Sequence, residues 1–334
     1  MSGEITMNKK RIFSGIQPSG EITIGNYLGA LKNWTKLVSE YECIFSVVDL
    51  HAITVRQDPI ELRHRCYALL AQYIACGLDP EKCTMFIQSH VPEHTQLSWL
   101  LGCYTYMGEL SRMTQFKEKS SRHADNINAG LFTYPVLMAS DILLYNADLV
   151  PVGHDQMQHL ELTRNIAERF NGIYGDVFTV PEGYIAKVGA RIMDLSEPEK
   201  KMSKSQPKGS VALLEDADSI MKKFKRAVTD SESTIKFEEG RPGVCNLISI
   251  YSSVTGKTIE ETEKEFDGKG YGDFKKAVGE AVVSELTPIQ AKYNDLMNNK
   301  DYLEQVFNKG ADYAKQIAEE TLKKVYDKVG YILR

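Results

Sequence analysis

Residues 11–26 read RIFSGIQPSGEITIGN, and the order of residue types in this stretch predicts how the chain begins to fold. The first six residues form a short apolar run typical of a β-strand, and QPSGEIT after them is rich in turn residues. We expect a helix to begin near Gly25, with free backbone N–H groups that favour an anion. A glycine-rich connector without a ligand has the same composition, so both interpretations remain open here.

The same alternation continues for about 190 residues. CIFSVVDL, residues 43–50, is a continuous apolar run, as expected of a strand covered on both faces. Further strands are predicted at 84–88, 149–152 and 177–180, with helical patterns between them. This rhythm predicts parallel pairing with right-handed crossovers, hence an α/β fold with a Rossmann-like doubly wound parallel sheet. Such sheets bind ligands beyond the carboxyl ends of their strands.

After about residue 208 the strand patterns end. The remaining sequence has helical patterns only: one at 214–228, one opening at Pro242, and long Lys- and Glu-rich stretches to the end. We therefore divide the chain into a sheet domain over residues 1–208 and a smaller all-helical domain over 209–334. The last helix of the second domain could pack back on the first.

Composition places the 334-residue chain among ordinary globular proteins, with 43% hydrophobic and 25% charged residues. The longest apolar run, around residues 134–144, contains Pro135 and Asp141 and is too short to span a bilayer. The first ten residues, MSGEITMNKK, lack the apolar core of a secretory signal. Six cysteines without a CxxC pair indicate reduced thiols, so we expect a cytoplasmic protein.

The net charge of −5 argues against a uniformly basic nucleic-acid binder. It leaves room for local basic patches that meet phosphate. Such patches occur at residues 9–11, 117–122, 200–208 and 222–226, the third of which reads KKMSKSQPK. Each patch by itself is also typical of an ordinary solvated face.

Several familiar motifs are absent or broken. The sequence contains neither GxxxxGK[ST] nor GxGxxG, which excludes a P-loop and a dinucleotide fingerprint. HVPEH, residues 90–94, resembles an inverted zinc-protease motif, but Pro92 disrupts the helix that would bring both histidines to one face. No metal site is predicted.

The helix pattern TYPVLMASDILLYNA, residues 133–147, has Asp141 as its only charged residue. Tyr134, Met138 and Asp141 are spaced i, i+4 and i+7 and therefore share one face. A buried carboxylate must be hydrogen-bonded or paired. Asp141 could anchor the fold, or it could be the polar point of an apolar pocket for an aromatic molecule with one N–H or O–H group.

The turn GHDQ, residues 153–156, follows the apolar strand DLVPV. Asp155 lies where a strand ends and a helix begins, which suits a ribose hydroxyl and equally suits a helix N-cap.

The TIGN turn, GHDQ and KMSKS occur in the order and rough spacing of the class I aminoacyl-tRNA synthetases, which the chain resembles. Within that class it is most similar to the bacterial enzymes for tryptophan, from about Ile12 to the C-terminal helices. The segments that carry this resemblance are GIQPSG, VDLHAIT, GELSRMTQFKEKS, TYPVLMASDILLYNAD, PVGHDQMQHLELTRNIAERFN, GARIMDL, KMSKS, AVTDSE and GKGYGDFK. Two positions depart from the wider class: TIGN places Thr23 and Asn26 where HIGH has histidines, and His154 stands where GxDQ often has an acid.

The resemblance implies an aminoacyl-tRNA ligase that is a cytoplasmic homodimer. It would activate L-tryptophan with Mg·ATP to tryptophanyl-adenylate and pyrophosphate, then transfer tryptophan to the 3′-terminal adenosine of tRNA(Trp). Residues 1–208 would bind ATP and tryptophan, and residues 209–334 would bind the tRNA anticodon.

The resemblance also implies roles for individual residues. Those that assist catalysis at the phosphates are Lys119, Lys201 and Lys204. Those that bind ATP are Gln17, Pro18, Ser19, Gly25, Asn26, Gly153, His154, Asp155, Ile192, Lys201, Met202, Ser203, Lys204 and Ser205. Those that bind tryptophan are Phe13, His51, Tyr134, Met138, Asp141 and Gln156.

Two other functions remain as alternatives. A tyrosine-specific enzyme has the same fold and reaction, but TIGN and MASDIL favour tryptophan. A non-catalytic tRNA-binding relative would have no need of phosphate-binding lysines, which KMSKS retains.

Overall fold

The computed structural model describes residues 9–115, 127–153, 156–184, 191–203, 206 and 208–333. Within these residues a five-stranded sheet has the order β3-β2-β1-β4-β5, and every pairing in it is parallel. The predicted α/β class with a parallel sheet is confirmed. The strands are β1 (Arg11–Ile16), β2 (Glu42–Val47), β3 (Thr84–Ile87), β4 (Leu149–Pro151) and β5 (Glu182–Tyr184).

One predicted strand is wrong. Residues 177–180 form a loop, and the last strand begins at Glu182 instead. The side chain of Asn171 accepts hydrogen bonds from the N–H groups of Val177 and Phe178 and donates to the carbonyl of Phe178. Because this side chain uses the backbone groups that a sheet ladder would need, the apolar run packs as a loop.

The sheet is covered on both faces, as the apolar strands predict. Neighbouring residues of a strand point to opposite faces, and accordingly Ile12 and Phe45 belong to one core, while Phe13 and Ile44 belong to the other. The helices of this half are α1 (Ile24–Asn26), the π-helix η1 (Tyr27–Leu31), α2 (Lys32–Glu40), α3 (Asp49–Ala52), α4 (Pro59–Ala75), the 3-10 helix η2 (Gln88–His90), α5 (Glu93–Gly102), α6 (Met107–Ser111), α8 (Ala129–Leu143) and α9 (Met157–Tyr174).

The strand order places a switch point between β1 and β4. From β1 the chain continues to β2 and β3 on one side, and it later returns to β4 and β5 on the other. Crossovers that leave in opposite directions open a crevice at the carboxyl ends of the two central strands. This crevice is where the fold itself predicts a ligand.

The C-terminal part of the chain is helical, as predicted. Its helices are α10 (Ala217–Arg226), α11 (Pro242–Thr255), α12 (Ile259–Glu265), α13 (Tyr271–Asn298) and α14 (Lys300–Val329). Phe224, Val244 and Phe274 from these helices share one apolar core with Ile24 and Met202. The two halves therefore have a continuous core between them.

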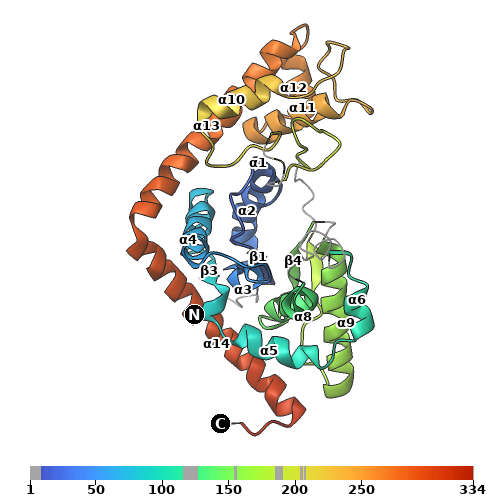
Figure 1. The fold of residues 1–334 in the computed structure, drawn as a ribbon, viewed down its shortest axis with the longest axis vertical. Coiled ribbons are helices and arrows are strands. Elements are labelled where there is room, and N and C mark those ends of the chain that lie inside the picture. The colour runs from blue at the N-terminus through green and yellow to red at the C-terminus, as the bar shows by residue number, and fades with distance from the viewer. Residues whose placement is uncertain are drawn as a thin grey trace, which may run out of the picture.

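The helices α13 and α14 run along one side of the molecule, from the helical half to the far end of the sheet domain (Figure 1). The helix α14 lies against β3, and the approach is close: a Cβ added to Gly310 would lie 1.9 Å from the carbonyl oxygen of Met85. In the part of the chain that the structure describes, no helix combines the length and apolarity that a bilayer crossing requires.

Candidate functional site

A cavity of about 390 Å³ opens at the switch point, between the carboxyl ends of β1 and β4. It brings together all six residues that the resemblance assigned to tryptophan, together with Gln17 and Ser19 from the turn after β1. The lining residues are Phe13, Ser14, Gly15, Ile16, Gln17, Ser19, Val48, His51, Gln115, Tyr134, Met138, Asp141, Ile142, Val150, Pro151, Val152 and Gln156. Two other cavities, each of about 510 Å³, lie along α14 and contain none of the predicted site residues.

Asp141 lies at the wall of this cavity and is only 2% exposed. Its Oδ1 accepts hydrogen bonds from Nε2 of Gln88 and from a ring nitrogen of His94, both at 2.6 Å. Its Oδ2 lies 2.7 Å from Nε2 of His51. The carboxylate therefore receives donors from α3, η2 and α5, all of which are far from Asp141 in the sequence.

The surroundings of Asp141 keep it ionised. Burial by itself raises the pKa of a carboxyl group, but the two histidines and their hydrogen bonds outweigh burial and hold the pKa of Asp141 well below its usual range. The ring of His94 contacts Asp141 through Nδ1 and the hydroxyl of Tyr145 through Nε2, at 2.7 Å. Burial raises the pKa of Tyr145 well above its ordinary value, so this hydroxyl stays protonated and can donate to Nε2 of His94. The Nδ1–H of His94 is then directed at the carboxylate.

Ionised Asp141 has room for one further donor. A carboxylate offers about four lone-pair positions. Among the described residues, donors occupy two of these on Oδ1 and one on Oδ2. The carboxylate thus fixes the fold and still offers one acceptor position at the cavity, which unites the two interpretations that the sequence left open.

Tyr134 forms a second polar group at the cavity. Its hydroxyl lies 2.8 Å from Nε2 of His159 and donates to Oε1 of Gln115 at 3.3 Å. Burial raises the pKa of Tyr134 to about 12, so the hydroxyl remains neutral at physiological pH. Gln156 lines the same cavity, so the cavity has polar groups besides Asp141.

The segment of KMSKS that the structure describes is one arm of a short hairpin. The N–H of Met202 donates to the carbonyl of Ile192, and the N–H of Asp194 donates to the carbonyl of Lys200. Met193 and Lys201 are paired as an antiparallel bridge. Met202 and Ile192 are buried, while the side chain of Lys201 is exposed.

This hairpin packs against the turn after β1. A Cβ added to Gly25 would lie 3.3 Å from Cβ of Met202 and 3.7 Å from Cβ of Ile192. Asn26 and Thr23 cap the helix start reciprocally, since the amide oxygen of Asn26 accepts from the N–H of Thr23 and Oγ1 of Thr23 accepts from the N–H of Asn26. Four residues predicted for ATP, from the two ends of the sheet domain, are therefore neighbours.

The other residues predicted for ATP have varied positions. Pro18 is buried, and Gly153 is exposed at the end of β4, outside the cavity lining. Ser203 is half-buried at the end of the hairpin. Five predicted residues lie outside the described residues: Lys119, His154, Asp155, Lys204 and Ser205.

The groups behind Asp141 and Tyr134 are not evident from sequence patterns. His94 belongs to the HVPEH segment that resembles a metal motif, but it lies in α5 with both ring nitrogens hydrogen-bonded inside the core. Gln88 and His159 carried no local signal. Val150, Pro151 and Val152 could have been found, because they lie where a strand next to the switch point ends.

Comparisons with known proteins agree with this geometry. The family model for class I tRNA synthetases (W and Y) matches residues 6–287. The tryptophan–tRNA ligase of Clostridium tetani (strain Massachusetts / E88) is 58% identical over 328 residues, which are 98% of this chain and 97% of the relative.

Two solved structures have the same fold over nearly their whole length. Tryptophanyl-tRNA synthetase from Mycoplasma pneumoniae is 37% identical with a TM-score of 0.88, covering 97% of this chain and 98% of that one. The enzyme from Campylobacter jejuni, complexed with ADP and tryptophan, is 34% identical with a TM-score of 0.82, covering 96% and 99%.

The parallel sheet, its switch-point cavity and the KMSKS hairpin define a protein of the class I synthetase type. The chain belongs to the class I tRNA synthetases of the W and Y family. The resemblance that the sequence motifs indicated is confirmed.

Proposed function

We propose that this chain is a tryptophan–tRNA ligase. The observation that carries the proposal is the ionised, buried carboxylate of Asp141, which offers one acceptor position in a cavity of about 390 Å³ that Phe13 and Met138 also line. An indole has one N–H group on an apolar ring, which matches one acceptor in such a cavity. The 58% identity to a tryptophan–tRNA ligase supports the same substrate.

Tryptophan would bind with its ring between Phe13 and Met138 and its N–H directed to Oδ2 of Asp141. His51 would contact the ring beside the carboxylate. The hydroxyl of Tyr134 and the amide of Gln156 would hold the α-amino group, since both line the same cavity.

The first step needs no general base, because the α-carboxylate of tryptophan is already ionised at pH 7. A carboxylate oxygen attacks the α-phosphorus of Mg·ATP, the bond from that phosphorus to the bridging oxygen of the β-phosphate breaks, and pyrophosphate leaves. In the second step a hydroxyl of the terminal adenosine of tRNA attacks the carbonyl carbon, and AMP leaves. Positioning and neutralisation of phosphoryl charge provide most of the catalysis.

For ATP, the magnesium ion would enter with the nucleotide as part of the substrate. Lysine ammonium groups suit phosphoryl oxygens, and we assign this role to Lys119, Lys201 and Lys204. Adenine would lie against Ile192 and Met202, and Asp155 would accept from the ribose. The turns would complete the nucleotide site with Gln17, Pro18, Ser19, Gly25, Asn26, Gly153, His154, Ser203 and Ser205.

We assign residues 1–208 to catalysis and residues 209–334 to the tRNA anticodon. The support for the second assignment is basic surface on α10, where Lys222, Lys225 and Arg226 are exposed. Lys223 of the same helix pairs with Glu215 at 2.7 Å and so is directed to its own domain.

We further propose a homodimer. The helices α5 and α6, together with the N-cap residue of α6, carry large exposed apolar side chains: Trp99 is 76% exposed, Tyr106 63% and Met107 70%. Residues of this kind are typical of interface centres. Six free thiols fit a cytoplasmic enzyme, in the compartment where tRNA is used.

ATP–pyrophosphate exchange tests the proposal directly. Exchange should depend on tryptophan and should be absent with tyrosine or with no amino acid, and tRNA(Trp) should then accept tryptophan. Exchange that depended on tyrosine instead would identify the protein as a tyrosine-specific member of the family. A folded protein that bound tRNA without any exchange would be a non-catalytic relative.

A further inference from the structure

Asn246 of α11 holds the backbone of the nucleotide segment. It is 4% exposed, and its side-chain amide bonds both backbone groups of Met193: the amide oxygen accepts from N–H of Met193, and Nδ2 donates to its carbonyl, each at 2.8 Å. A neighbouring β-strand would satisfy a residue in the same way. One side chain of the helical half therefore acts as an edge partner for a segment of the sheet half.

The position of Met193 in the hairpin explains why this partner is needed. In an antiparallel pair, successive residues direct their N–H and C=O groups to alternate sides. Ile192 and Asp194 bond to the arm that contains KMSKS, so the backbone groups of Met193 point away from that arm. A buried amide group without a partner is costly, and Asn246 supplies both partners at once.

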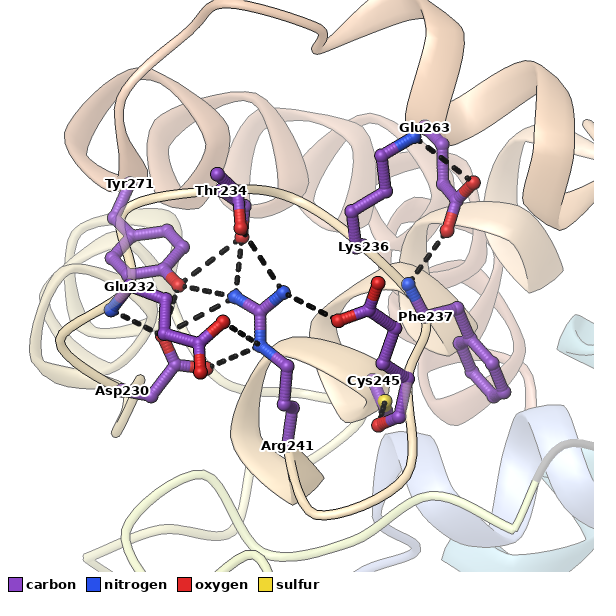
Figure 2. Close-up of polar contacts among 10 residues, drawn as sticks. Asp230, Glu232, Thr234, Lys236, Phe237, Arg241, Cys245, Glu263 and Tyr271 are labelled. Carbon is purple, nitrogen blue, oxygen red and sulfur yellow. Dashed lines mark hydrogen bonds and ion pairs between the residues drawn. The ribbon is translucent and has the colours of Figure 1, made fainter.

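The helix that carries Asn246 is fixed at its N-terminus. The buried guanidinium of Arg241 bonds Asp230, the carbonyl of Thr234 and the hydroxyl of Tyr271 (Figure 2). The hydrogen bond from Arg241 is the main reason that the pKa of Asp230 is lowered to about 2, so this ion pair persists at physiological pH. The start of α11, the loop before it and α13 are thus held together.

A second hydrogen bond joins the same edge of the hairpin to the segment before α11, two residues after Met193. The N–H of Val228 donates to the carbonyl of Leu195 at 2.8 Å. The helix α11 touches Val228 directly, because a Cβ added to Gly243 would lie 2.2 Å from the carbonyl oxygen of Val228. Residues 193 and 195 are therefore both held by the helical half.

We propose that Asn246 is a positioning residue for ATP. It holds residues 192–195, and through the hairpin it sets the distance between Met202 and the turn at Gly25. The inference rests on the proposed function, in which ATP binds between that turn and the hairpin. Among the described residues, the side-chain hydrogen bonds of Asn246 go to the backbone of Met193, so Asn246 acts through the residues that contact the nucleotide.

Two variants and a matched control test this role by pyrophosphate exchange. Asn246→Ala removes both hydrogen bonds to Met193. Asn246→Asp keeps an acceptor for the N–H of Met193 but places a second oxygen, in place of the donor, next to its carbonyl oxygen. The control is Asn171→Ala, which removes side-chain hydrogen bonds of the same kind to the backbone of Val177 and Phe178. Asn171 lies near the end of α9 and lines no part of the cavity.

Both Asn246 variants should raise KM for ATP by about tenfold or more while KM for tryptophan changes by less than about twofold, since buried backbone groups lose their partners only on the nucleotide side. Asn171→Ala should lower the Tm and leave both KM values unchanged. KM does not depend on the fraction of enzyme that is folded, so an unstable variant still gives a result, and Asn246→Asp serves if Asn246→Ala does not fold.

Unchanged KM for ATP in a folded Asn246 variant would overturn the inference, and so would an equal rise for both substrates. Failure of the proposed function has a different signature, because the wild-type protein would then show no tryptophan-dependent exchange. In that case the affinity for ATP is measured by equilibrium binding instead of by KM. If Asn246→Ala binds ATP as tightly as the wild type, the positioning role is again overturned.

Discussion

Replacement of Asp141 by asparagine should separate its contribution to the fold from the role that we propose for it, which is to accept the substrate N–H. The amide has nearly the shape of the carboxylate but only one oxygen acceptor. If that oxygen takes the position of Oδ1, it keeps the donors from Gln88 and His94. The amide nitrogen then faces Nε2 of His51, and its second hydrogen faces the cavity.

The expected loss of stability is small. His51 can accept from the amide if its proton moves to the other ring nitrogen, so at most one buried donor loses its partner, which costs about 1–3 kcal/mol. The loss of specificity should be much larger. A site built to accept a hydrogen bond rejects an analogue without the donor by roughly 10⁴ in favourable cases, which is about 5.6 kcal/mol at about 1.4 kcal/mol per tenfold change. In Asp141→Asn an amide N–H would face the indole N–H, so the site would no longer favour a substrate with a donor over an analogue without one.

The assay compares kcat/KM in pyrophosphate exchange for tryptophan and for benzothienylalanine, in which sulfur replaces the indole N–H. The ratio should fall from roughly 10⁴ to about 10 or less in Asp141→Asn. Thermal unfolding is measured in parallel. Asp148→Asn is the control, because Asp148 accepts from the N–H of Arg11 at 2.7 Å outside the cavity lining, so it should affect stability alone.

A folded Asp141→Asn enzyme with the wild-type ratio would refute the assignment of Asp141 to the indole N–H. A variant that loses both activities in proportion to its unfolding would show that Asp141 only fixes the fold.

Three further predictions follow from the site and its surroundings. Lys204→Ala should slow single-turnover adenylate formation by on the order of 10²–10³ with little change in tryptophan binding, because one stabiliser of developing charge is lost; a wild-type rate would contradict this role. Glutamate at Lys222, Lys225 and Arg226 should lower tRNA charging while pyrophosphate exchange continues, and unchanged charging would remove α10 from the tRNA site. Burial raises the pKa of Asp141, but the two histidines lower it by more, so the folded protein favours the ionised carboxylate. The contribution of this carboxylate to folding stability should be complete above about pH 5 and decrease as the pH falls below about 4. Urea unfolding curves should therefore lose stability at acid pH more steeply in the wild type than in Asp141→Asn, and parallel losses would contradict it.

Local patterns in the sequence were sufficient for the class of fold. Strand runs such as CIFSVVDL, and a helix that begins one residue before Gly25, follow from residue type and spacing over fewer than about 20 positions. Strand order was not local, yet alternating strands and helices leave few topologies to choose from. The site at the switch point was therefore predictable together with the fold.

The error at residues 177–180 shows the limit of local patterns. An apolar run of this length suits a strand, but a side chain of α9 satisfies its backbone groups. Whether these side-chain hydrogen bonds form depends on where the helix ends relative to the apolar run, and the periodicity of the sequence does not reveal this.

Residue type and spacing alone are enough to predict the kind of chemistry: an α/β sheet, lysines suited to phosphate and one carboxylate in an apolar helix. The state of that carboxylate depends on packing, because its donors His51, Gln88 and His94 lie 90, 53 and 47 residues away in the chain. The same holds for Asn246, which is 53 residues from Met193. Hydrogen bonds need partners within about 3 Å in space, and the chain sets that distance only after its helices and strands have packed.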